Sequence, residues 1–139
     1  SESVLRVTIS DDLCRVFTVM EMAVDPAKGS LDTFVDQVNT SITEKEKATI
    51  VERKKIATSF GEGVYVRSSL PAGGPCYIIS FPKGKHIPPA ETAVIFLQVG
   101  QRIYLIEYLL GGDREWPGFE TKPVDTVLMN FFDGFKILK

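Results

Sequence analysis

The sequence predicts an α+β fold in which a single antiparallel sheet of six or seven strands carries two main helices packed on it. Short apolar or alternating segments recur between turn residues, which is typical of strands joined by hairpins. Two further segments carry apolar residues at helical spacing. The chain has 139 residues, of which 44% are apolar. This is enough for one domain with a core and too little for two, so we expect residues 1–139 to form a single domain.

The strands are predicted from apolar patterning between turn residues. The expected ranges are 4–10, 15–24, 48–59, 64–69, 76–81, 92–99 and 102–110. Residues 61–63, Gly-Glu-Gly, make a tight connection inside 48–69, so that segment is expected to form a hairpin. Gly100-Gln101 joins the last two strands, and a glycine at the first of two turn positions fits a type II′ hairpin. The strand at 102–110 is apolar on both faces, so we expect it to be central and covered on both sides.

Both helices are predicted from stripes of apolar residues at three- and four-residue spacing. The first is expected over 30–43, with Ser30 as its N-cap and Asp32 in the first turn, where the helix dipole favours an anion. Its buried stripe is expected to be Leu31, Phe34, Val35, Val38 and Ile42. Truncation of Phe34 to alanine is expected to cost about 3–5 kcal/mol, as for other buried aromatic residues. The second helix is expected over 122–134, ending at Asp133-Gly134.

Composition and charge exclude several classes of protein. Sixteen Lys and Arg against eighteen Asp and Glu give a net charge of −2. A dedicated nucleic-acid-binding protein usually carries a basic excess, so no nucleic-acid partner is expected. The Glu-Arg-Lys-Lys run at 52–55 is interpreted as a charged strand edge that discourages aggregation rather than as a basic patch. No run of about 18 apolar residues is present, so no transmembrane segment is expected. The sequence does not indicate a cellular compartment.

Residues that could carry catalysis or bind a metal are few. His86 is the only histidine, and with no nucleophile motif in the chain we interpret it as an exposed loop residue. Glu107 lies in an apolar strand, where burial would raise its pKa and suit it to act as a general base. Alternatively, Glu107 pairs with a Lys or Arg or lies at a solvated rim. Cys14 and Cys76 are predicted to be reduced thiols, with a disulfide as the alternative, and neither has the spacing of a metal ligand. We expect no cofactor, no metal and no enzymatic activity, a hydrolase or isomerase built on Glu107 or His86 being the alternative.

Two irregular segments are candidate binding surfaces, because loops held on a rigid sheet often carry binding residues. The loop at 82–90 combines cations with prolines, which restrict the backbone and reduce the entropy lost on docking. The segment at 113–119 adds a polar and aromatic surface. The candidate binding residues are Lys83, Lys85, His86, Arg114 and Trp116. The tryptophan would serve either as an anchor for a partner or as part of a loop tucked onto the core.

Three segments of the chain resemble the PsbP-like superfamily. They are Ser-Leu-Asp-Thr-Phe-Val-Asp-Gln-Val at 30–38, Arg-Ile-Tyr-Leu-Ile-Glu-Tyr at 102–108 and Phe-Phe-Asp-Gly-Phe-Lys-Ile at 131–137. The resemblance extends over roughly residues 13–138. This superfamily includes a photosystem II extrinsic protein, a Ran-binding import factor and small bacterial periplasmic proteins. The resemblance implies an α/β/α sandwich with a non-enzymatic role in protein binding or assembly, and it implies no catalytic residue.

These observations favour a non-catalytic accessory or adaptor domain that binds another protein, of unidentified nature and in an undetermined oligomeric state. The alternative is a small-ligand or lipid carrier that uses a pocket between helix and sheet, with Met20, Met22 and phenylalanine-rich faces as its lining. An elongated apolar cavity would favour the carrier, and a flat exposed apolar patch would favour the adaptor.

Overall fold

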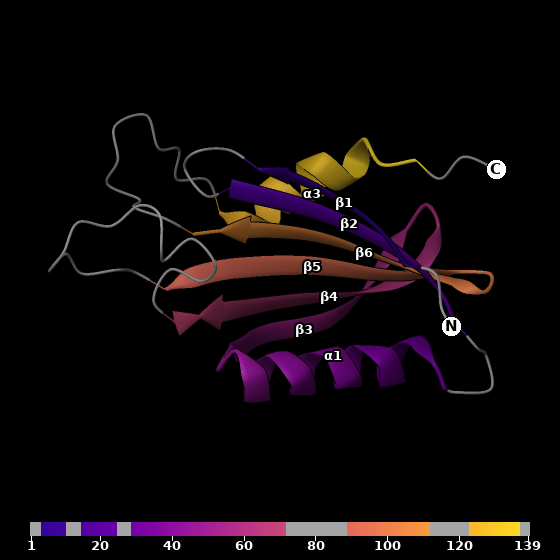
Figure 1. Cartoon of the computed structure of the whole chain (residues 1–139). Coiled ribbons are helices and arrows are strands. Elements are labelled where there is room, and N and C mark those ends of the chain that lie inside the picture. Colours follow the sequence, from indigo (N-terminus) through magenta and orange to yellow (C-terminus); the bar gives the residue numbers. More distant parts are fainter. Residues whose placement is uncertain (1–3, 11–14, 25–28, 72–88, 112–122, 137–139) are drawn as a thin grey trace, which may run out of the picture.

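A computed structural model describes residues 4–10, 15–24, 29–71, 89–111 and 123–136, without the side chains of residues 4, 5 and 10. These residues form a six-stranded antiparallel sheet and two helices (Figure 1). The strands are β1 (Val4–Ser10), β2 (Arg15–Ala23), β3 (Thr49–Thr58), β4 (Gly61–Leu70), β5 (Ala90–Val99) and β6 (Arg102–Leu110). The helices are α1 (Leu31–Lys45) and α3 (Val124–Asp133). The predicted α+β class is confirmed, while the strand expected at 76–81 lies outside the described residues.

The strand order is β1-β2-β6-β5-β4-β3, and every neighbouring pair is antiparallel. β6 therefore lies in the interior of the sheet, between β2 and β5, as its apolar residues on both faces predict. β1 and β3 form the two edges. The pairing of β3 shifts between Ile50 and Glu52, and the charged run at 52–55 follows this bulge. Bulges and charged residues are typical of protected edges, so the interpretation of this run as an edge is confirmed.

Glycine residues shape two hairpin turns. Gly100 has a φ of 62°, whereas Gln101 after it lies outside the left-handed region, which agrees with the expected type II′ turn. The turn between β3 and β4 comes earlier than expected, at residues 59–60. Gly61, with a φ of 115°, already pairs with Thr58, and the Thr58 hydroxyl donates to the Gly61 carbonyl at 2.7 Å. The expected connection at 61–63 is therefore part of β4.

The side of the sheet under α3 holds the larger core. The buried residues of α3 are Val124, Leu128 and Phe132. They pack with buried side chains of β4, β5 and β6. The helix ends as expected, because the Gly134 N–H donates to the Phe131 carbonyl at 3.2 Å. Phe135 then places its ring 5.9 Å from Phe60 and 6.2 Å from Tyr104, so the segment after α3 closes over the core.

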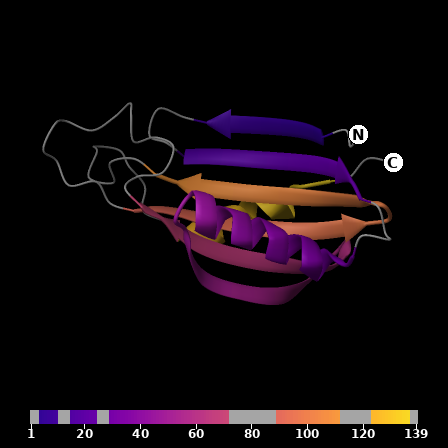
Figure 2. The ribbon, with the colours of Figure 1, turned by 60° about the horizontal axis from the view of Figure 1, so that its bottom comes forward.

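The opposite side of the sheet is covered only in part. α1 lies over β3, β4 and β5, and within the described residues no helix lies over β1 and β2 on this side (Figure 2). Ser30 is the N-cap, as predicted, since its side chain accepts the Thr33 N–H at 3.3 Å. The helix continues two residues beyond the predicted 43, to Lys45. The position of α1 over one half of the sheet decides where the second face stays accessible.

The apolar stripe of α1 is less buried than its spacing predicts. Val35 is fully buried, whereas Leu31, Phe34, Val38 and Ile42 are half-buried. The ring of Phe34 meets Phe96 edge-on at 6.2 Å, and its other side lines a cleft. The expected full burial of Phe34 is therefore wrong, because the helix stands over one half of the sheet and its stripe borders open space.

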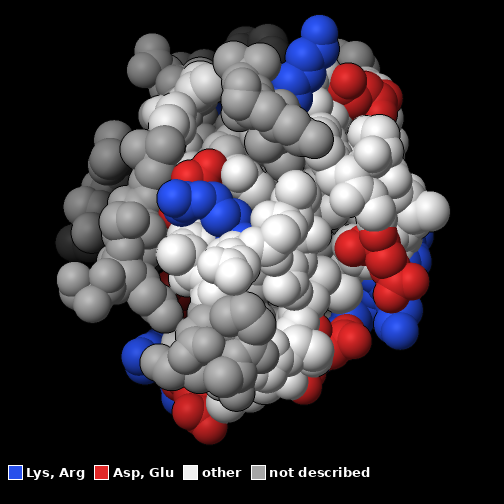
Figure 3. Space-filling model, turned by 90° about the vertical axis from the view of Figure 1, so that its right-hand side faces the viewer, with Lys and Arg blue, Asp and Glu red and all other residues white. Residues whose placement is uncertain are grey.

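An ion-pair group fastens α1 to the edge strand β3. Arg53 donates to the Asp36 carboxylate and lies 3.3 Å from the Asp32 carboxylate. The hydrogen bond to Asp36 is the main reason why the pKa of Arg53 is raised. The two lysines that follow are also paired, with carboxylates of β3 and β4 at 3.4 and 3.7 Å. Charges of both signs are likewise interspersed on the end of the molecule shown in Figure 3. The cations of this run are thus neutralised rather than gathered into a basic patch.

Candidate ligand-binding cleft

A cleft of about 670 Å³ lies between α1 and the uncovered half of the sheet. Small-molecule sites typically measure about 300–1,000 Å³, so the cleft has the size of a ligand site. α1 forms one wall, and β1, β2, β4, β5 and β6 contribute the rest. The lining residues are Arg6, Thr18, Met20, Met22, Phe34, Val38, Ile42, Glu46, Ser68, Leu70, Pro71, Thr92, Leu105, Glu107 and Leu109.

Most of this lining is apolar, and the alternation of the strands explains why. Successive residues of a strand point to opposite faces, and paired residues of neighbouring strands share a face. Met20 pairs with Leu105 across β2 and β6, so both contribute to the same surface. Val38 faces them from the α1 stripe. Met20 and Met22, the residues expected to line a carrier pocket, both line this cleft. Their flexible thioether side chains can adapt to ligands of irregular shape.

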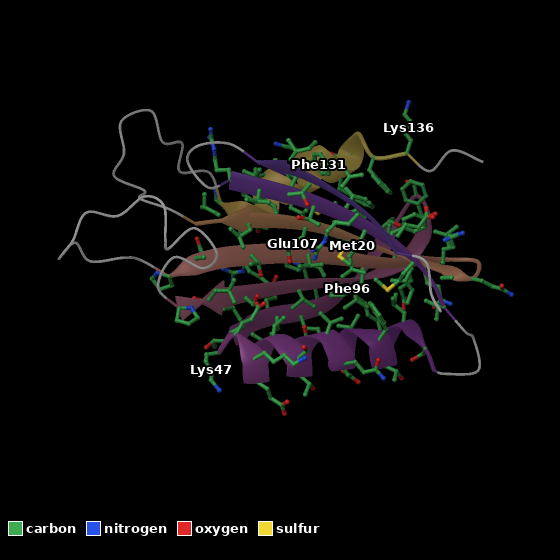
Figure 4. All side chains as sticks on the ribbon, in the orientation of Figure 1. Met20, Lys47, Phe96, Glu107, Phe131 and Lys136 are labelled. Carbon is green, nitrogen blue, oxygen red and sulfur yellow. The ribbon has the colours of Figure 1, made fainter. Side chains whose placement is uncertain are left out.

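Glu107 stands on the floor of the cleft. It pairs with Thr18 across β2 and β6, and Figure 4 shows it beside Met20 near the middle of the sheet. Removal of water by burial raises the pKa of Glu107, the negative charge of Glu46 raises it further, and the positive charge of Arg6 lowers it. Within the described part of the chain, Glu107 makes no hydrogen bond and no ion pair. Glu107 is half-buried, so it keeps some contact with the open cleft while partial removal from water raises its pKa. A direct pair with Lys or Arg is not seen among these residues.

A hydroxyl pair lies close to Glu107 on the same face. Ser68 and Thr92 stand opposite each other on β4 and β5 and share a hydrogen bond of 2.5 Å. Both residues are buried, with 2% and 5% of their surface exposed. Each hydroxyl satisfies the other, which is how buried polar groups are normally accommodated. Among the described residues, the carboxyl group of Glu107 has no hydrogen-bond partner of this kind.

Two exposed charges stand at the rim of the cleft. Arg6 comes from the edge strand β1, and its Nη2 lies 3.7 Å from the sulfur of Met20. Glu46 is the C-cap residue of α1. Among the described residues, the charged groups that line the cleft are therefore two carboxyl groups and one guanidinium. This balance gives the cleft an acidic character when both carboxyl groups are ionised.

The binding residues predicted from the sequence are not part of the described cleft. Lys83, Lys85, His86, Arg114 and Trp116 all lie outside the described residues, as do Cys14 and Cys76. Their roles stay predictions. Within the described ranges, no group of three or more His, Cys, Asp or Glu side chains is placed to hold a metal ion. The two helices described here are also too short or too polar to cross a membrane.

Several cleft residues escaped the sequence analysis. They are Arg6, Thr18, Glu46, Ser68 and Thr92. Thr18, Ser68 and Thr92 are polar residues whose nearest neighbours on the same face of their own strand are apolar, whereas Arg6 shares its face of β1 with Thr8. The pattern is visible within each strand, but only the pairing of strands shows that these positions meet.

A second hollow, of about 380 Å³, lies beside α3 on the other side of the sheet. The Tyr65 hydroxyl there is buried and has no hydrogen-bond partner among the described residues. Burial, reinforced by the negative charge of Asp125, raises the pKa of Tyr65 to about 12. The ammonium of Lys54 lies 5.2 Å from the centre of the Tyr65 ring. This hollow is smaller than the cleft under α1, and we assign no ligand to it.

The fold and the cleft define a class of protein: an α+β domain with an antiparallel sheet, a helix on each face and an open cleft under one helix. No family model and no curated protein matches the chain. Among solved structures, the chain is similar to PA94 from Pseudomonas aeruginosa, a protein of unknown function described as a putative regulator. The TM-score is 0.58 at 6% sequence identity, and the match covers 100% of this chain and 85% of that one. A similarity at this identity shows the fold alone, and the resemblance to the PsbP-like superfamily stays a prediction.

Proposed function

We propose that this protein binds a small, largely apolar ligand in the cleft between α1 and the sheet and acts as its carrier. The observation that carries the proposal is the cleft itself, with its volume of about 670 Å³ and its apolar walls from α1, β2 and β6. Phe34 and Val38 keep part of their surface accessible there instead of packing fully on the sheet. A bound ligand would remove this surface from water, a gain of about 25 cal/mol for each Å² of apolar area buried.

The proposal is tested with an uncharged fluorescent probe, N-phenylnaphthylamine, whose emission rises in an apolar site. We expect saturable binding at one site per chain. Val38→Trp and Met20→Trp add bulk from opposite walls of the cleft, so each should weaken probe binding about tenfold or more through lost space. Thr40→Trp is the matched control, because Thr40 is exposed on α1 and does not line the cleft.

The outcomes of this titration are distinct. Loss of binding in both cleft variants, with melting temperatures near that of the wild type and normal binding in the control, supports a carrier. Absence of saturable binding to the wild type, or equal binding by all four chains, would overturn the proposal. If the cleft variants lose binding as expected, extraction of the wild-type protein with organic solvent, followed by mass spectrometry, identifies any natural ligand that copurifies.

A second candidate function, the binding of a protein partner, is supported by the edge strand β1. Val7 and Ile9 are 52% and 59% exposed there and belong to one apolar stripe. Edge strands with exposed apolar residues are prone to pair with other chains. A partner retained from host extract by the wild type and lost with Val7→Asp/Ile9→Asp would support this function. The predicted loop site is tested in parallel with Lys83→Ala/Lys85→Ala and with Trp116→Ala, and unchanged affinity in both would exclude those loops.

A further inference from the structure

The floor of the cleft holds a half-buried carboxyl group, that of Glu107, which has no partner among the described residues. Glu107 belongs to an interior strand, and the same floor shows how a polar group is accommodated when its partner is present, in the hydrogen bond between Ser68 and Thr92. A carboxyl group removed from water without a replacement partner costs free energy. A group of this kind inside a cleft of ligand size indicates a site that a ligand completes.

The surroundings of Glu107 favour a cation over an anion. On the paired strands, β2 places Thr18 opposite it and β5 places Val94 there, neither of which carries charge. Among the described residues, the charged side chains that face it are Glu46 from the C-terminal end of α1 and Arg6 from β1. The C-terminal end of a helix also carries the negative end of the helix dipole, which attracts cations. Among the described lining residues, the one cation available to a negative ligand is Arg6, which is exposed at the rim.

We propose that the cleft takes a cationic amphiphile, a molecule with an apolar body and a protonated amine, and that the Glu107 carboxylate accepts the amine. This inference rests on the proposed function, since it names the ligand class of the same cleft. The ammonium donates to the carboxylate, and the neighbouring Thr18 hydroxyl is a further acceptor. The apolar body lies against Met20, Leu105 and Phe34. An anionic amphiphile held by Arg6 would instead leave Glu107 buried against an apolar chain.

The experiment displaces N-phenylnaphthylamine with three ligands that share one apolar tail, all below their micelle concentrations. Decylamine is cationic, decanol is neutral and decanoate is anionic. We expect the wild type to bind decylamine about tenfold or more tightly than decanol, the gain of a charge-assisted hydrogen bond. Glu107→Gln should remove this preference and keep the affinity for decanol. Glu44→Gln is the matched control, because Glu44 is exposed on α1 and does not line the cleft, so the preference should be kept.

The pH dependence supplies a second measurement. A cation bound at Glu107 favours the ionised carboxylate, so binding releases a proton wherever the free carboxyl group still holds one. The affinity for decylamine should therefore rise with pH and level off once Glu107 is ionised in the free protein. The affinity for decanol should not follow this curve. In Glu107→Gln the rise should be absent, whereas Glu44→Gln should retain it.

The outcomes separate this inference from the function on which it rests. Probe binding with equal affinities for decylamine and decanol would overturn the cationic ligand and leave the carrier function standing. Tightest binding of decanoate, lost in Arg6→Gln, would overturn it in favour of an anionic ligand. A preference for the amine that survives Glu107→Gln would show that Glu107 is not the acceptor. Absence of probe binding would overturn both.

Discussion

The hydrogen bond between Ser68 and Thr92 allows a sharp test of how the floor of the cleft is built. The two residues stand opposite each other on β4 and β5, share a 2.5 Å hydrogen bond and are almost fully buried. Ser68→Ala leaves the Thr92 hydroxyl buried without its partner, and Thr92→Val does the same to the Ser68 hydroxyl. Each single substitution should cost about 1–3 kcal/mol, the usual penalty for an unsatisfied buried group. The double variant leaves neither hydroxyl, so it should cost no more than the costlier single one.

Urea denaturation of the four chains measures this cycle, with unchanged m-values as the sign of an unaltered two-state transition. The coupling free energy should reach about 0.5 kcal/mol or more. Thr49 and Ser69 provide the matched control, because they face each other on β3 and β4 without a hydrogen bond between them. Thr49→Val and Ser69→Ala should each change stability by less than about 0.5 kcal/mol. Additive costs for the Ser68 and Thr92 substitutions would mean that water from the cleft satisfies both hydroxyls, and the reasoning would fail.

Three further predictions concern packing and pH. A Cβ at Gly63 would stand 2.9 Å from the Leu97 side chain, so Gly63→Ala should cost about 1–3 kcal/mol in urea melts. In Gly134→Ala the added Cβ would lie 3.6 Å from its nearest neighbour, the Phe131 carbonyl oxygen, which is ordinary contact. A loss of stability equal to that of Gly63→Ala would contradict the steric explanation. Leu128 of α3 is fully buried against the sheet, so Leu128→Ala should lower the free energy of unfolding by about 2–5 kcal/mol. A loss below about 1 kcal/mol would mean that α3 does not cover the core. Burial raises the pKa of Glu107, so the folded state holds that proton more tightly than the unfolded state. Wild-type stability should therefore fall as pH rises from the unfolded to the folded pKa, and Glu107→Gln should lack this fall. Parallel curves of melting temperature against pH would exclude a raised pKa.

Local features of the sequence were enough to predict much of the fold. The Ser30 cap, the glycine of the turn at 100–101 and the end of α3 at Gly134 each depend on residues a few positions apart. The range of β6 and its place in the interior of the sheet followed from its apolar residues on both faces. The turn between β3 and β4 was misplaced because three neighbouring residues, Gly61 to Gly63, offered a connection that strand pairing overrode.

The candidate site was predicted only in part. Met20 and Met22 were expected to line a pocket between helix and sheet, and both line the cleft. Arg6 and Thr18 were not predicted as site residues, because their own strands do not show which residues of other strands they will meet. Glu107 was recognised as unusual, but its sequence neighbours left open whether it would be paired, solvated or buried.

The sequence by itself determined which segments become strands and helices and which side of each segment is apolar, because these properties depend on spacing within a few residues. Only the tertiary structure decided that β2 pairs with β6, which brings Thr18 opposite Glu107 from a distant part of the chain. It also decided that α1 covers β3, β4 and β5 and leaves β1 and β2 uncovered. Both choices depend on contacts between segments far apart in the chain, whose free energies no local pattern contains. The cleft follows from those two choices, as does the lack of a partner for Glu107 among the described residues.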